Sequence, residues 1–202
     1  MKTQIITILT ALVLVAGVAK ADTTATAKNE DVTILTDVSS INKIEVRGNV
    51  LLYISDGSAD QVKVYNKYYA ESALVKSRNG VLSIASYKAE KLVVWVTAAD
   101  LSSIAAYDNS EVKTFGDISK IEFNVELHNN ASAKMSFDAF TADVTVTDNA
   151  KADISGTTTE FNLTHSVGST VNHTNLSAEY FTEVRTGVAT VAAKTDDDIT
   201  AL

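Results

Sequence analysis

Apolar and polar residues alternate with a period of two over most of this chain, in short segments that end at Asn, Gly, Asp or Ser. Residues 44–46 and 50–54 are examples, and residues 81–84 alternate in the same way directly after Asn79-Gly80. That dipeptide is a strong signal for a β-hairpin, because both of its residues accept positive φ. A helical period of 3.6 does not persist beyond one or two turns after residue 31. The pattern therefore predicts an all-β fold.

Turn residues recur at a nearly constant spacing in the second half of the chain. They are Asn109, Asn130, Asn149, Gly168 and Gly187, and the sequence separations between successive members are 21, 19, 19 and 19. Asn and Gly readily adopt positive φ, so we expect these five residues to form left-handed corners of successive coils. Units of this length bury their apolar faces by stacking on one another. The spacing predicts a right-handed parallel β-helix with coils of about 19–21 residues, preceded by less regular strands and a hairpin.

A β-sandwich is the alternative architecture. It explains the hairpin at Asn79-Gly80, but it gives no reason for the regular recurrence of Asn or Gly in the second half of the chain.

The N-terminal residues have the composition of a secretory signal peptide. Lys2 precedes an apolar stretch over residues 5–18, and Ala19-Lys20-Ala21 matches a cleavage site. The stretch is shorter than the ~20 residues of a transmembrane helix, so we expect no membrane insertion after cleavage. The expected organisation is a signal peptide over 1–21, a flexible leader over 22–31, a β-helix domain over 32–195 and an acidic tail over 196–202. Export to the periplasm, the cell surface or the extracellular space follows from it.

The charge balance excludes some partners. Lys and Arg number 17 against 25 Asp and Glu, which gives a net charge of −8. Removal of the predicted signal peptide takes two lysines and no acid, so the mature chain carries −10. A polyanion repels such a chain, and nucleic acid is therefore not an expected partner. The absence of cysteine means that the fold forms without disulfides.

The order of the motifs resembles a known family of exported bacterial proteins, the putative auto-transporter adhesin, head GIN domain family. The matching segments run from Ile44 to Ile54, Gln61 to Val64, Asn79 to Ile84, Leu92 to Thr97 and Leu101 to Ile104, followed by the regularly spaced corners. The family's corners are typically Gly-Ser-Gly, whereas this chain has Asn-Ser or Asn-Ala at the first three. The resemblance implies a β-helical surface or periplasmic protein, and it supplies no established catalytic residues.

Two acids are the main candidates for catalysis. Asp108 and Asp148 each precede a corner Asn, and two coils would separate them by ~9.6 Å. This is close to the range of roughly 6.5 to 9.5 Å that inverting glycosidases use. The same residue types also cap turns through their side chains. Because no basic residue or third acid recurs beside them, we expect a protein that is not an enzyme, with a carbohydrate-active enzyme as the alternative.

Metal-binding motifs are missing from the sequence. The three histidines, His128, His165 and His173, have no ligand spacing of a metal site. Asp196-Asp197-Asp198 lacks the alternate spacing of a calcium loop. We therefore expect no metal and no other cofactor.

Tyrosines gather in one lysine-rich stretch, at Tyr53, Tyr65, Tyr68, Tyr69 and Tyr87. Tyrosine gives good binding surface at low entropic cost, although it also favours strands for structural reasons. We take Tyr65, Tyr68 and Tyr69 as candidate ligand contacts. The sequence thus predicts an exported, non-enzymatic adhesin that binds a glycan or a surface protein, with a structural envelope component as a further alternative.

Overall fold

The computed structural model describes residues 32–35, 38, 40–65 and 73–187 of the 202-residue chain. Every secondary-structure element within these ranges is a β-strand, so the predicted all-β class is confirmed. No helix in the described ranges has the length and apolar character to cross a membrane. The predicted signal peptide, leader and acidic tail lie outside the described residues.

The strands are short in the first half of the chain and long in the second. They are β1 (Val32–Leu35), β2 (Lys43–Gly48), β3 (Val50–Asp56), β4 (Gln61–Tyr65), β5 (Ala73–Arg78), β6 (Val81–Ser86), β7 (Leu92–Ala98), β8 (Ser103–Ala106), β9 (Glu111–Thr114), β10 (Ile118–Leu127), β11 (Ser132–Val146), β12 (Lys151–Ser166) and β13 (Thr170–Thr186).

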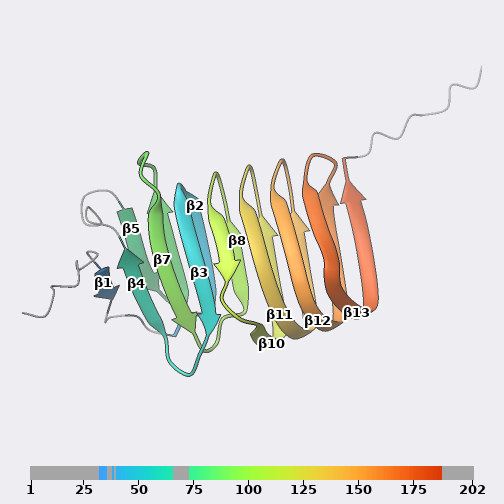
Figure 1. Cartoon of the computed structure of the whole chain (residues 1–202), viewed down its shortest axis with the longest axis horizontal. Coiled ribbons are helices and arrows are strands. Elements are labelled where there is room, and N and C mark those ends of the chain that lie inside the picture. The colour runs from blue at the N-terminus through green and yellow to red at the C-terminus, as the bar shows by residue number, and fades with distance from the viewer. Residues whose placement is uncertain (1–31, 36–37, 39, 66–72, 188–202) are drawn as a thin grey trace, which may run out of the picture.

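The thirteen strands form one curled, mixed sheet. Its order is β1-β4-β7-β3-β9-β11-β10-β8-β2-β6-β5, and β12 and β13 continue from β11. Figure 1 shows the strands standing in two layers, with β4, β7 and β3 in one layer and β5, β2 and β8 in the other. The chain of pairs from β8 through β10, β11 and β12 to β13 is parallel. The pairs β1–β4, β4–β7 and β5–β6 are antiparallel.

The finer prediction of a right-handed parallel β-helix is not confirmed, because the sheet is mixed. The chain reverses directly at Asn79 and Gly80, whose φ angles are 52° and 79°, and places Arg78 opposite Val81 in an antiparallel hairpin. Two consecutive residues with positive φ match the right-handed twist of the strands, as the sequence suggests for this dipeptide. A sandwich of two separate sheets does not describe the fold either, since the described strands form one connected sheet.

The parallel strands pair with nearly constant offsets in sequence. β10 and β11 pair with an offset of 19, as in Ile118 opposite Phe137, and β11 and β12 keep the same offset. β8 and β10 pair with an offset of 21, and the offset between β12 and β13 changes from 19 to 20 after Asp153. Residues with these separations therefore lie side by side on the same face of the sheet.

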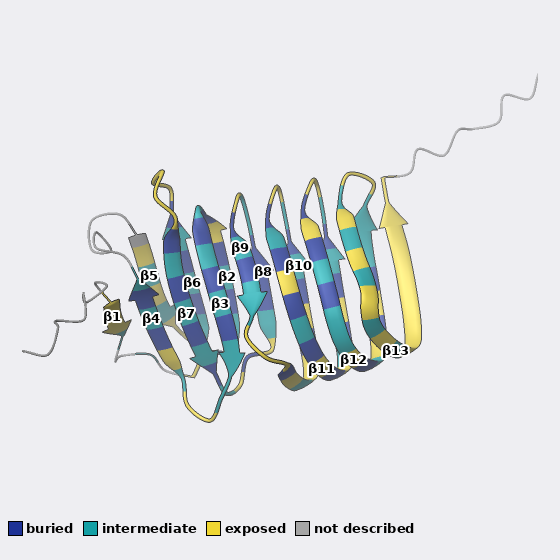
Figure 2. Ribbon diagram, in the orientation of Figure 1, coloured by how far each residue is buried: buried dark blue, intermediate teal, exposed yellow. Residues whose placement is uncertain are grey.

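The hydrophobic core lies between the two layers. Figure 2 shows buried and more exposed positions alternating along the strands of both layers, as expected when one face of a sheet is covered. The rings of Phe123, Phe137 and Phe161 are at most 2% exposed and pack in a row, with centroid distances of 5.6 and 6.5 Å. Burial of one such side chain contributes about 1.5–3 kcal/mol. The last strand, β13, is exposed along most of its length (Figure 2).

Candidate functional site

The predicted turn column lies in the turns that follow β8, β10, β11, β12 and β13. Its left-handed residues are not the predicted ones. Positive φ belongs to the residue before each corner Asn, with values of 62° at Asp108, 60° at Asn129 and 56° at Asp148. The expectation of a left-handed conformation at Asn109, Asn130 and Asn149 was therefore wrong by one position. Asp and Asn both tolerate this conformation because their short polar side chains bond locally, so the dipeptides Asp-Asn and Asn-Asn did not reveal which residue takes it.

The two glycines of the column have different structural roles. Gly187 has a φ of 79°, as predicted. Gly168 is not among the residues with positive φ, so that prediction was wrong. A Cβ at Gly168 would lie 2.7 Å from the backbone oxygen of Asp148, which means that glycine is required there for space.

The side chains before the corners connect neighbouring turns. Asp148 Oδ2 accepts a hydrogen bond from the backbone N–H of Asn129 at 2.9 Å, and Asn129 Oδ1 accepts one from the N–H of Asp108 at 3.3 Å. Asp108 Oδ2 accepts from the N–H of Gly48 at 3.1 Å. Asn129 thus lies between the two candidate catalytic acids, and each acid already binds a backbone amide. This arrangement explains Asp108 and Asp148 as residues that shape the turns.

The tyrosine cluster is divided by the fold. Tyr65 is half-buried on the outer face of β4, whereas Tyr68 and Tyr69 lie outside the described residues. Tyr53 stacks on Trp95 of the neighbouring strand β7, with a centroid distance of 4.6 Å and an interplanar angle of 25°. Tyr87 is 72% exposed, and its hydroxyl donates to Asp108 Oδ2 at 3.4 Å. Tyr53 and Tyr65 therefore share the outer face of one layer, whereas Tyr87 follows β6 of the other layer.

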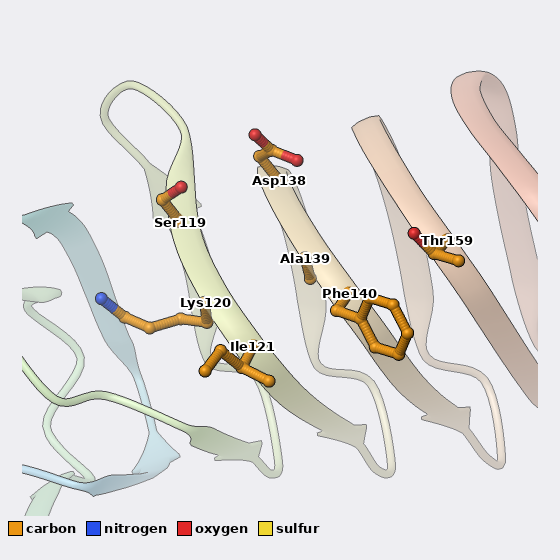
Figure 3. A pocket seen from close by; sticks show the side chains of 7 residues that line it. All are labelled: Ser119, Lys120, Ile121, Asp138, Ala139, Phe140 and Thr159. Atoms are coloured by element: carbon orange, nitrogen blue, oxygen red, sulfur yellow. The ribbon is translucent and has the colours of Figure 1, made fainter.

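Two exposed apolar side chains mark a hollow that the sequence did not reveal. Ile121 is 76% exposed and Phe140 is 56% exposed. They stand on adjacent strands, between the paired positions Lys120–Ala139 and Glu122–Thr141. Figure 3 shows both side chains projecting to the same side of the sheet.

The lining of this hollow is mixed in character. Its volume is about 470 Å³, and its walls are formed by Ser119, Lys120, Ile121, Asp138, Ala139, Phe140 and Thr159 of β10, β11 and β12 (Figure 3). The Lys120 ammonium points away from Phe140 and forms an ion pair with Asp56 Oδ1 at 2.6 Å. Asp138 accepts a hydrogen bond from the Thr157 hydroxyl at 2.8 Å, and this bond fixes the orientation of its carboxylate. The hollow thus combines an exposed ring with one oriented carboxylate and two hydroxyl groups.

Alternation along the strands could not have identified these exposed residues. Ile118 and Phe123 are both buried although they are five positions apart, and so are Phe137 and Ala142. Successive side chains of a regular strand point to opposite faces, so the alternation changes phase between these core residues. Ile121 and Phe140 lie within these intervals, two positions before Phe123 and Ala142, where strict alternation would have placed them in the core.

The histidines contact ordinary polar neighbours. His128 Nδ1 lies 2.9 Å from the Thr147 hydroxyl, and His165 Nε2 lies 2.8 Å from Glu183 Oε1. Within residues 32–35, 38, 40–65 and 73–187, no three His, Cys, Asp or Glu side chains are grouped so that they could hold a metal ion.

The chain belongs to a family of adhesin-like proteins. The family model described as putative auto-transporter adhesin, head GIN domain, matches residues 40–201, which confirms the resemblance seen in the sequence. None of the curated proteins compared matches this chain.

Several solved structures are similar to this chain at low sequence identity. A putative adhesin from Parabacteroides distasonis is 16% identical, with a TM-score of 0.56 over 78% of this chain and 79% of its own. A putative adhesin from Bacteroides fragilis is 10% identical, with a TM-score of 0.48 over 77% of this chain and 96% of its own. A putative lipid binding protein from Parabacteroides distasonis is 10% identical, with a TM-score of 0.49 over 77% of this chain and 78% of its own. At 16% identity, the likeness to the first of these structures concerns the fold alone.

Proposed function

We propose that this chain is an exported, non-enzymatic adhesin and that its hollow around Phe140 binds a glycan. The observation that carries the proposal is the exposure of Ile121 and Phe140 side by side on adjacent strands. Isolated exposed apolar residues are common, but neighbouring ones rimmed by polar groups are typical of binding sites.

The polar rim favours a glycan over a protein partner. A sugar presents C–H groups on one face and hydroxyl groups around its edge. The exposed ring of Phe140 suits the C–H face, and the Asp138 carboxylate accepts hydrogen bonds from hydroxyl groups. Ser119 and Thr159 add groups that can donate as well as accept. Membership of the adhesin-like family supports a surface ligand of this kind.

A glycan array probed with wild-type protein and with Phe140→Ser tests the proposal. We expect wild-type binding to a restricted set of glycans and at least a tenfold loss of affinity in the variant. Tyr180→Ser is the matched control, because Tyr180 is a similarly exposed aromatic residue, at 67%, on a different strand. Equal losses in both variants would contradict the assignment to the hollow. If the wild type binds a host protein but no glycan, and Phe140→Ser loses this binding, the hollow is the site of a protein partner.

The alternative of a carbohydrate-active enzyme has a separate test. Turnover of polysaccharides that is abolished by changing Asp108 and Asp148 to Asn would overturn the non-enzymatic proposal. Loss of an essential acid or base typically lowers the rate by at least ~100-fold.

Export is proposed from the first 21 residues. Cleavage after Ala21 would release a chain that begins at Asp22, in the periplasm, at the cell surface or outside the cell. N-terminal sequencing of fractionated cells tests this. Intact Met1 in the cytoplasm would contradict it.

We also propose that the segment from β8 to β13 forms a right-handed parallel β-helix with coils of about 19–21 residues. The parallel pairing from β8 through β10, β11 and β12 to β13 supports this description. A crystal structure tests it, and a left-handed connection between β11 and β12 would contradict it.

A further inference from the structure

A second surface lies on the outer face of the layer that contains β4, β7, β3 and β9. Strand register places one residue of each strand in a single row across this face, in the order Lys63, Trp95, Tyr53, Lys113, Lys134 and Asp153. A parallel row beside it contains Tyr65, Val93, Leu51, Glu111, Ser132 and Lys151. These two rows are called the lysine face below.

The lysine face carries positive charge in an acidic protein. Its two rows hold four lysines and two carboxylates, and Lys91 adds a fifth lysine through its contact with Glu111. The local charge is therefore +3, whereas the whole chain carries −8. Such a local reversal attracts anions to one side of the molecule and repels them from the rest.

The lysines are held in different ways. Glu111 Oε1 forms an ion pair with Lys113 at 2.7 Å, and Glu111 Oε2 pairs with Lys91 at 3.1 Å. The single negative charge of Glu111 thus neutralises only one of the two positive charges of Lys113 and Lys91. Lys134 lies 3.6 Å from Asp153 Oδ2 and its side chain is 75% exposed. In the part of the chain that the structure describes, no carboxylate forms an ion pair with Lys151.

The cations surround a shallow hollow next to the aromatic pair. The hollow has a volume of about 270 Å³, and its lining includes Lys113, Lys134, Lys151, Glu111 and Asp153. Tyr53 lies next to Lys113 in the row, and Trp95 stacks on Tyr53 from the other side. Phe115, which is 67% exposed, packs against Trp95 with a centroid distance of 5.8 Å. A bound molecule could therefore contact ammonium groups and aromatic surface together.

We propose that the lysine face binds an acidic polysaccharide, with Lys134 and Lys151 contacting its carboxylate groups and the Phe115, Trp95 and Tyr53 side chains contacting its sugar rings. Lysine suits this role because its ammonium is a mobile point charge that accommodates carboxylates in varied positions. The row from Lys63 to Lys113 crosses three strand spacings, about 14 Å, so several units of an extended polymer can lie along it. This surface is separate from the hollow around Phe140, since Lys134 and Phe140 are six positions apart on β11, about 20 Å of extended strand.

The surroundings favour a polysaccharide over other polyanions. The remaining charge of the chain is strongly negative, which opposes the wide electrostatic contact that nucleic acid requires. The aromatic side chains beside the cations give sugar rings a contact that a polyglutamate chain does not exploit.

Binding of the purified chain to polygalacturonate, measured by calorimetry in low salt, tests the inference. We expect binding that weakens as salt is raised, because charges this exposed are screened. Changing Lys134 and Lys151 together to Gln should lower the affinity about tenfold. The variant loses two exposed ion pairs with the polymer, and each contributes at most about a fivefold factor to the affinity. Changing Lys76 and Arg78 together to Gln is the matched control, since it removes the same charge from exposed positions of β5, and we expect less than a twofold effect.

Three further outcomes decide the assignment. Equal affinity for neutral dextran would overturn the role of charge. Tighter binding to poly-L-glutamate than to polygalacturonate would overturn the polysaccharide and assign the face to an acidic peptide. A control variant as weak as the Lys134 and Lys151 variant would overturn the location. Phe140→Ser should leave the affinity for polygalacturonate unchanged, so failure of the function proposed above is distinguishable from failure of this inference.

Discussion

The carboxylate of Asp148 accepts a hydrogen bond from the backbone N–H of Asn129 at 2.9 Å. The bond joins the turn between β11 and β12 to the turn between β10 and β11. Asp148 also has a φ of 56°, so one residue provides the left-handed corner and the link to the neighbouring corner. The acid at this position is explained by the fold, and its two properties can be separated by substitution.

Asp148→Ala should lower the free energy of unfolding by about 2 kcal/mol. The variant loses the hydrogen bond to Asn129, which contributes about 1 kcal/mol, and places Ala in a left-handed conformation that costs about 1 kcal/mol more. Asp148→Asn keeps an acceptor oxygen and tolerates positive φ, so we expect a change below about 0.5 kcal/mol. Urea denaturation of both variants measures the difference. Equal destabilisation would show that neither property of the side chain matters at this corner.

Gly156→Ala should destabilise the fold more severely than substitution of a glycine in an open turn. A Cβ at Gly156 would lie 1.9 Å from the backbone oxygen of Phe137, and the φ of Gly156 is 114°. We expect a loss of about 3 kcal/mol or more, because the backbone of β11 or β12 has to move. Gly116→Ala is the control, since Gly116 has a φ of 79° but no atom within 4 Å of the added carbon. It should cost about 1 kcal/mol, and a similar cost at both sites would contradict the steric explanation.

Phe137 and Phe140 should respond in opposite ways to replacement by alanine. Phe137 is fully buried between the rings of Phe123 and Phe161, so Phe137→Ala should lower the free energy of unfolding by about 3–5 kcal/mol. Phe140 is 56% exposed, and Phe140→Ala should change the free energy of unfolding by less than about 0.5 kcal/mol. Thermal unfolding of the two variants measures this. A large loss in Phe140→Ala would mean that this ring supports the fold and would weaken the case for a binding hollow.

The ion pairs of Glu111 should make stability depend on pH. Hydrogen bonding to Lys113, and then to Lys91, lowers the pKa of Glu111 in the folded protein below its ordinary value of 4.5. A carboxyl group with a lowered pKa binds its proton more readily in the unfolded chain. Its stabilising contribution is therefore fully present above about pH 4.5 and is lost as the pH falls through the lower folded pKa.

Melting temperatures between pH 7 and pH 3 test this contribution. Glu111→Gln should melt below the wild type at pH 7, and the gap should close as the pH approaches 3. Glu179→Gln is the control, because Glu179 is exposed on β13 and forms no ion pair within the described residues. A gap for Glu111→Gln that stays constant with pH would show that the loss comes from packing rather than from charge.

The sequence determines much of the local structure because the signals are local. Alternation of apolar and polar residues is sufficient for the all-β class, and Asn79-Gly80 is sufficient for the hairpin between β5 and β6. The separations of 21 and 19 between turn residues are also the offsets with which β8, β10, β11 and β12 pair. Family membership can likewise be recognised from the order of short motifs.

Only the tertiary structure decided which residues meet. Trp95 and Tyr53 are 42 positions apart, and they stack because β7 and β3 pair in one particular register. Lys63 and Lys134 belong to one row for the same reason, although β4 joins that row by antiparallel pairing. The left-handed corner residue also depends on the hydrogen bonds between turns, since Asp108 and Asn109 have similar intrinsic tolerance for positive φ. Pairing register is a property of contacts between distant segments, so the periodicity of a single strand cannot determine the neighbours of a side chain across the sheet.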